Sequence, residues 1–218
     1  MNRSKNIIVV CEGASEWMYL QRLNSFLSSL PFPDGWFDVP IRFVGKPPKT
    51  GVGTGEYKAI EREIRRVGKQ NCSLERWTWV DADLYVRNDK ACGDHYLKRP
   101  MGIAPFAFSV LNFEDFLALH LDDDRFSLWK EVMTKAGHFQ EPLHWEEYRP
   151  LYQKIVPGYH KADIPVDFIT LASLGNLRRH LMQMPFVDLK GLSVGRTFAD
   201  FMLAEITCWY KIPEIDCC

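Results

Sequence analysis

Two short apolar runs that each end in acidic residues constrain the fold of this chain more than any other feature. Residues 6–11 are followed directly by Glu12, and residues 77–80 are followed by Asp81 and, two positions later, Asp83. A continuous apolar run of this length is typical of a strand that is covered on both faces. Because ligands of open α/β sheets lie outside the carboxyl ends of the strands, the three carboxylates occupy positions where chemistry is expected.

The rest of the amino-terminal part alternates between helical and extended patterns. Apolar residues recur at three- and four-residue spacing over residues 16–30 and 56–70, which predicts two amphipathic helices. Strands are predicted at 39–44 and 105–111, and a short apolar helix at 112–120. This order predicts an α/β fold with a mostly parallel sheet of about four strands flanked by helices.

The carboxyl-terminal part has a mainly helical pattern. We expect a core over residues 1–125 and, over residues 126–218, a helical extension packed on that core, since no linker separates the two. Within the extension, helices are predicted at 127–136, 146–155, 166–184 and 197–206.

The charge of the chain is nearly balanced but unevenly distributed. The net charge is −1, so no basic field of the whole molecule points to nucleic acid. Residues 1–80 hold 12 Lys and Arg against 8 Asp and Glu, whereas residues 81–150 hold 8 against 13. This split is compatible with a metal site beside a phosphate-binding surface, and it is also compatible with chance.

Cysteine usage and hydropathy predict a cytoplasmic protein that does not enter a membrane. The six cysteines follow no zinc-binding spacing, and no signal peptide opens the sequence. The longest apolar runs are far shorter than the roughly 20 residues that a membrane span requires. A reducing compartment is therefore expected.

Asp81 and Asp83 would lie on one face of an extended backbone, because side chains alternate along a strand. Two such carboxylates require a positively charged partner, and oxygen-rich sites suit Mg²⁺ or Mn²⁺. Each motif alone has a simpler explanation, since Glu12 could be a surface residue in a glycine turn and the aspartates could form a solvated turn or a helix cap. The combination favours a metal-dependent enzyme that acts on a phosphate ester.

Several separated segments resemble a Toprim domain, the catalytic fold shared by topoisomerases, primases and OLD-family nucleases. They are residues 7–12 with Gly13, Ser15, Glu16 and Tyr19, the pair Asp81 and Asp83, residues 109–120 ending in His120, and the Tyr-x-Lys sequence at 159–161. The chain is most similar to the RloB-like branch of small Toprim proteins found near restriction and phage-defence loci. The resemblance covers roughly residues 6–165.

This resemblance implies roles for individual residues. Glu12 becomes a metal ligand or general acid/base, and Asp81 and Asp83 become metal ligands. Glu16 would complete the catalytic site one helical turn beyond Glu12, and Glu114 would lie near it. Lys161 would contact the scissile phosphate or stabilise the leaving oxygen. Glu114 could instead be an ordinary acid in a first helical turn, and Lys161 a solvated surface residue. Ser15 is predicted to cap the first helix.

The implied activity is a Mg²⁺- or Mn²⁺-dependent endonuclease that cleaves DNA or RNA, tRNA included, as an antiviral defence effector. Relatives are often paired with an ATPase encoded nearby, and this chain has no Walker motif of its own. A homo-oligomer is compatible with the sequence. The alternative is a non-catalytic, metal-binding regulatory or interaction module of a defence complex, which the low net charge favours because nucleases usually present a more basic surface.

Overall fold

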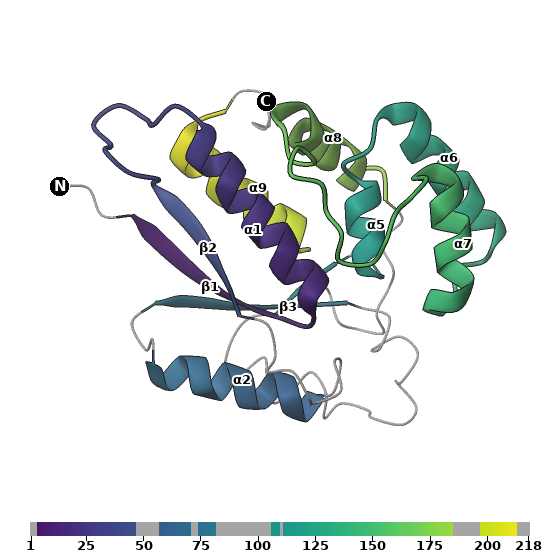
Figure 1. The fold of residues 1–218 in the computed structure, drawn as a ribbon, viewed down its shortest axis with the longest axis horizontal. Coiled ribbons are helices and arrows are strands. Elements are labelled where there is room, and N and C mark those ends of the chain that lie inside the picture. Colours follow the sequence, from purple (N-terminus) through teal and green to yellow (C-terminus); the bar gives the residue numbers. More distant parts are fainter. Residues whose placement is uncertain are drawn as a thin grey trace.

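A parallel four-stranded sheet forms the centre of the protein. The computed structural model describes residues 4–46, 57–70, 74–81, 106–109, 111–184 and 197–212. All pairings between the strands are parallel, and the strand order is β2-β1-β3-β4 (Figure 1). The strands are β1 (Lys5–Cys11), β2 (Ile41–Lys46), β3 (Glu75–Val80) and β4 (Phe106–Phe108). The predicted α/β fold with a parallel sheet of about four strands is confirmed.

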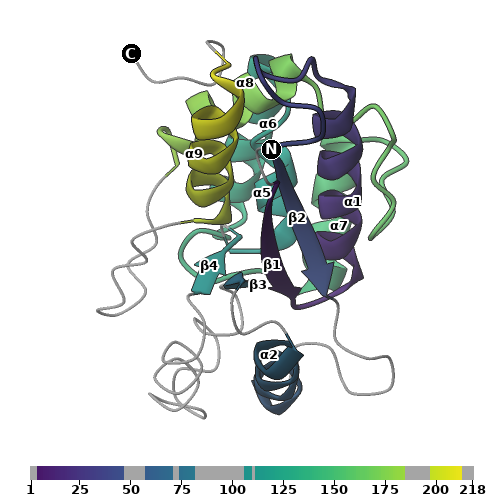
Figure 2. The same ribbon diagram turned by 90° about the vertical axis from the view of Figure 1, so that its left-hand side faces the viewer.

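Helices cover both faces of this sheet. Helix α2 lies on one face, and α1 and α9 lie on the other (Figures 1 and 2). Helices α6 and α7 lie beside α5 and α8 lies above it in Figure 1, all on the side of the sheet opposite α2. The described helices are α1 (Ala14–Ser29), α2 (Tyr57–Gln70), α5 (Phe113–Ala118), α6 (Asp123–Lys135), α7 (Trp145–Ile155), α8 (Leu171–Leu181) and α9 (Phe198–Tyr210).

Several predicted boundaries are wrong, and a capping side chain gives the reason at the starts of α6 and α8. Strand β4 is shorter than the predicted run and ends at Phe108. Helix α6 begins four residues before the predicted start, because the Asp122 side chain accepts the backbone N–H three residues further on. Helix α8 begins only at Leu171, since Thr170 caps it in the same way.

The main core lies between the sheet and the layer of α1 and α9. Ile7, Val9 and Cys11 of β1 and Trp79 of β3 face this layer and are fully buried. The Trp79 ring stacks on Phe198 of α9 with centroids 3.8 Å apart, and Tyr19 of α1 meets the Trp79 ring edge-on at 5.7 Å. The last described helix is therefore an integral part of the sheet's covering layer.

Gly45 of β2 lies in close contact with α1. A Cβ atom at this position would lie 2.9 Å from Cδ1 of Trp17 and 3.1 Å from Cδ1 of Leu20. We expect Gly45→Ala to lower the free energy of unfolding by about 1–3 kcal/mol, because the helix must shift to relieve the overlap. Urea denaturation measures this loss, with Ser25→Ala on the exposed side of α1 as the control. Equal stability of the two variants would contradict the close packing.

Candidate active site at the carboxyl edge of the sheet

The direction of the connections reverses between β1 and β3. From β1 the chain passes through α1 to β2 on one side, whereas from β3 it continues to β4 on the other side. In open α/β sheets, ligands bind at such a switch point, outside the carboxyl ends of the two strands. Glu12 follows β1 directly and Asp81 follows β3 directly, so both predicted residues lie at this point.

A hydrogen bond joins these two positions. The Asp81 backbone N–H donates to Oε2 of Glu12 at 2.8 Å. The Glu12 N–H in turn donates to the Trp79 carbonyl at 3.0 Å, which extends the β1–β3 ladder by one residue. Both acids are half-buried. The Glu12 carboxylate is therefore fixed at the end of β3, while Asp83, the third predicted ligand, lies outside the described residues.

Glu16 occupies the first turn of α1 and is also held by the backbone. Its Oε2 accepts the Gly13 N–H at 3.0 Å, and only 3 % of the residue is exposed. This bond explains why the predicted Ser15 cap is wrong. Gly13 is the N-cap, and Glu16, the third helical residue, makes the reciprocal half of a capping box.

Glu16, Glu114 and Lys161 influence one another electrostatically. Burial raises the pKa of Glu16 to about 7, the N–H groups of its helix turn and the Lys161 charge limit this rise, and Glu114 adds to it. Burial likewise raises the pKa of Glu114, which is 3 % exposed, and the charge of Lys161 again opposes the shift. Two acids from separate helices and one lysine from a later loop thus share an environment.

Tyr159 supports this second group of residues. Its hydroxyl donates to Oε1 of Glu114 at 3.0 Å, and the side chain is nearly buried. Lys161 lies over the Trp145 ring, with Nζ 5.3 Å from the centroid. The next residue, Ala162, has a φ of 64°, an unfavourable conformation for a residue other than glycine and one that is frequent at functional sites. Tyr159 was absent from the predicted site, although the Tyr-x-Lys sequence marked its position.

Asn112 is a further polar residue that the sequence did not single out. It is the N-cap of α5 and only 7 % exposed, yet its side chain makes no capping hydrogen bond. Among the described residues, none donates a hydrogen bond to Oδ1 of Asn112. Leaving a buried amide oxygen without a donor costs folding free energy. This atom can therefore accept a hydrogen bond from a ligand beyond the carboxyl end of β4.

Only part of the predicted metal site lies within the described residues. The Glu12 carboxylate lies beside the Asp81 backbone, and carboxylate oxygens are the donor type that Mg²⁺ and Mn²⁺ prefer. Within the described ranges, no group of three or more His, Cys, Asp or Glu residues is arranged to hold a metal ion. The third carboxylate of the predicted set, Asp83, belongs to the part of the chain outside these ranges.

Comparisons with known proteins add no relative. No family model matches the chain, and neither the curated proteins nor the solved structures give a match. Among the described helices, none is both long and apolar enough to cross a lipid bilayer.

The raised pKa of Glu16 predicts a pH-dependent stability. In the unfolded chain Glu16 ionises near its ordinary pKa of 4.5, whereas in the folded protein it keeps its proton up to about 7. The contribution of Glu16 to stability is therefore largest below pH 4.5 and decreases as the pH rises toward 7, by up to about 3 kcal/mol. In Glu16→Gln this decrease should be much smaller, and Glu114 accounts for what remains.

Urea denaturation at pH 4.5, 6 and 7.5 measures this slope. Glu141→Gln, at an exposed position, is the matched control. Parallel pH profiles for wild type and Glu16→Gln would show that the buried carboxyl does not carry the effect.

Proposed function

We propose that the protein is a Mg²⁺- or Mn²⁺-dependent Toprim-type endonuclease of the RloB-like kind, acting on phosphodiester bonds of DNA or RNA. The observation that carries this proposal is the hydrogen bond between the Asp81 N–H and the Glu12 carboxylate, which joins two acidic positions at the switch point of the sheet. A site of this kind places carboxylates where a parallel sheet binds its ligands.

The residues of the proposed site form two groups with different roles. Glu12 and Asp81, with Asp83, are the residues that would hold the metal ion. A bound divalent ion would polarise a phosphoryl oxygen and make a bound water more acidic. Glu16, with a pKa of about 7, is suited to hold or release a proton near neutral pH. Lys161 supplies positive charge for a phosphate oxygen.

Tyr159 and Glu114 have a positioning role in this scheme. The Tyr159 hydroxyl fixes one oxygen of Glu114, and the charge of Lys161 acts on the same carboxylate. This arrangement keeps the loop that carries Lys161 attached to the first turn of α5. In the cell we propose a cytoplasmic defence effector that works with an ATPase encoded nearby.

One observation favours a second function, that of a regulatory or interaction module. Glu16 and Glu114 are each only 3 % exposed, so a substrate reaches them only after the surrounding loops move. A module that binds metal without catalysis needs no such access. In that case the ATPase partner would control the assembly rather than the cleavage.

A metal-dependence assay distinguishes the two functions. Purified protein is incubated with mixed duplex DNA, single-stranded DNA and tRNA, in Mg²⁺, in Mn²⁺ or in a chelator, with and without the ATPase. The nuclease predicts cleavage with either metal that the chelator abolishes and that Asp81→Ala removes. Absence of cleavage under all conditions, with the ATPase present, would favour the module.

A further inference from the structure

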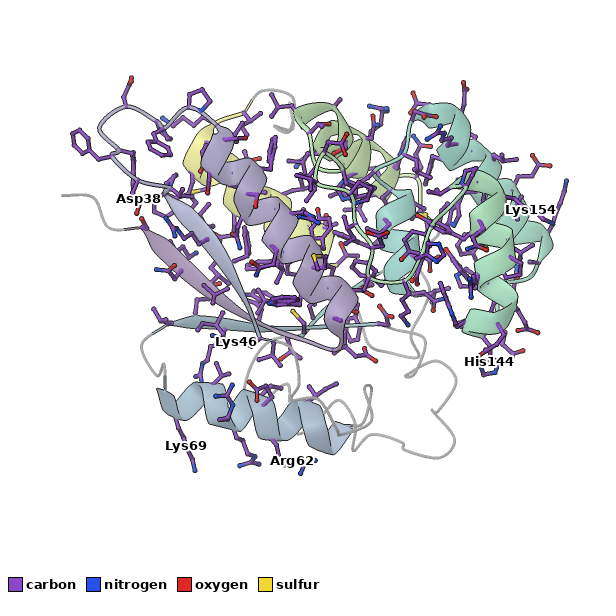
Figure 3. The ribbon with its side chains drawn as sticks, in the orientation of Figure 1. Asp38, Lys46, Arg62, Lys69, His144 and Lys154 are labelled. Carbon is purple, nitrogen blue, oxygen red and sulfur yellow. The ribbon has the colours of Figure 1, made fainter. Side chains whose placement is uncertain are left out.

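The outer face of α2 carries a stripe of positive charge. Arg62, Arg65 and Lys69 are exposed and recur at spacings of three and four residues, which places them along one side of the helix. Arg62 and Lys69 project from α2 away from the sheet (Figure 3). With a rise of 1.5 Å per residue, the stripe spans about 10 Å. Over residues 57–70 the sequence holds five Lys and Arg against two Glu.

Two neighbouring arginines are fixed next to this stripe. Nε of Arg66 donates to Oε2 of the buried Glu63 at 2.8 Å, which anchors that side chain to the helix. The side chain of Arg76, in β3, packs against α2 at Gly68. A Cβ atom at position 68 would overlap Nη1 of Arg76. Glycine at position 68 thus leaves room for a guanidinium from the sheet beside the stripe.

The position of α2 relates this surface to the candidate active site. A helix that connects two parallel strands begins at the carboxyl end of the first and returns to the amino end of the second. Helix α2 connects β2 to β3 in this way, so its first turns lie at the edge where Glu12 and Asp81 are found (Figure 1). A polymer that follows the stripe toward Arg62 runs toward that edge.

We propose that the surface formed by Arg62, Arg65, Arg66, Lys69 and Arg76 binds the phosphate backbone of a nucleic acid and directs it to the carboxyl edge of the sheet. This inference rests on the proposed nuclease function, because it names the surface by which the substrate is held. Guanidinium groups bind phosphate oxygens with good geometry, and such contacts position a nucleic acid without reading its sequence.

The composition of the stripe favours nucleic acid over an anionic membrane. A helix that lies on a membrane presents large apolar side chains together with its basic ones. The apolar side chains Ile60, Ile64 and Val67 are instead buried beneath α2, and the exposed positions 62, 65 and 69 are all basic. The surface also presents no aromatic ring at these positions on which a base could stack. Binding is therefore expected to be independent of sequence and strongly dependent on salt.

The test measures binding without cleavage. In a Glu12→Gln background and in a chelator, fluorescence anisotropy gives the Kd for two duplexes of unrelated sequence at several salt concentrations. Arg62→Gln combined with Lys69→Gln should weaken binding of both duplexes at least about tenfold and reduce the salt slope by about two. The matched control, Arg149→Gln with Lys154→Gln, removes the same charges from exposed positions of α7 (Figure 3 marks Lys154) and should change Kd less than twofold.

Three results would overturn the proposal. They are no duplex binding by the Glu12→Gln protein, an equal loss of duplex affinity in the two double variants, or an α2 variant that loses binding to phosphatidylserine vesicles while its duplex binding is unchanged. Failure of the nuclease function gives a different pattern. In that case Glu12→Ala and Asp81→Ala would leave any cleavage unaffected, whereas the α2 variant would still lose its duplex affinity.

Discussion

Replacing Asp115 by alanine is expected to lower the free energy of unfolding by about 3–5 kcal/mol, which is a large part of the total for a domain of this size. Asp115 is completely buried, and its carboxylate accepts hydrogen bonds from the N–H groups of Leu111 and Asn112, the Tyr148 hydroxyl at 2.6 Å and the His138 ring at 2.9 Å. The substitution leaves these donors buried without an acceptor, and each such group costs about 1–3 kcal/mol.

The hydrogen-bond network around Asp115 also extends the effect of the substitution to other helices. Nδ1 of His138 accepts the Leu143 N–H at 3.1 Å, so it is Nε2 that carries the proton toward Asp115. Tyr148 in turn accepts a hydrogen bond from the Trp129 ring nitrogen at 3.0 Å. One carboxylate therefore connects the start of α5, next to Glu114, to α6 and α7.

Urea denaturation of Asp115→Ala and of Asp124→Ala, an exposed acid in the first turn of α6, measures the difference. Should Asp115→Ala not fold at all, Tyr148→Phe provides a milder test, since it removes one donor and is expected to cost about 1–2 kcal/mol. Near-wild-type stability of both Asp115→Ala and Tyr148→Phe would show that the network contributes little.

The second large effect is expected on catalysis. Glu12→Gln should reduce the rate of nucleic acid cleavage by at least about 100-fold, because it removes a charge that the metal site or proton transfer requires. Its stability should change little, since the glutamine carbonyl oxygen can still accept the Asp81 N–H. A single-turnover cleavage rate, together with a urea midpoint for the same preparation, separates the two properties.

Glu146→Gln, at an exposed position in the first turn of α7, removes the same charge outside the site and should cleave at the wild-type rate. The metal dependence of the melting temperature gives an independent measurement. The Mg²⁺- or Mn²⁺-induced rise expected for the wild type should be lost in Glu12→Gln. Full cleavage by Glu12→Gln would remove this residue from the mechanism.

The sequence predicted the position of Glu12 and Asp81 because each follows a buried strand directly. Predicting the hydrogen bond between them would have required knowledge that β1 and β3 are neighbours in the sheet, and the apolar runs do not give the strand order. Asp115 is the contrary case. In the sequence it resembles any acid in a first helical turn, and its four donors come partly from His138 and Tyr148, 23 and 33 residues further along the chain. Such distant pairings arise from tertiary packing and leave no local pattern.

The same reasoning explains the second group of site residues. Glu16, Glu114 and Lys161 were predicted at one site, but only from the resemblance, and the electrostatic interaction among them emerges only when α1, α5 and the loop after α7 are placed together. Asn112 gave no signal, because an asparagine before a helix normally caps it. That no described residue donates a hydrogen bond to its Oδ1 becomes apparent only in three dimensions.

The packing of α9 on the sheet determines the order in which the protein can be completed during its synthesis. Phe198 stacks on Trp79, and Lys5 of β1 forms an ion pair with Glu205 at 2.8 Å, 200 residues along the chain. Contacts of such long sequence separation form late. The chain must therefore be synthesised at least to residue 205 before the first strand acquires these partners, and until then the Trp79 ring lacks the Phe198 ring that stacks on it.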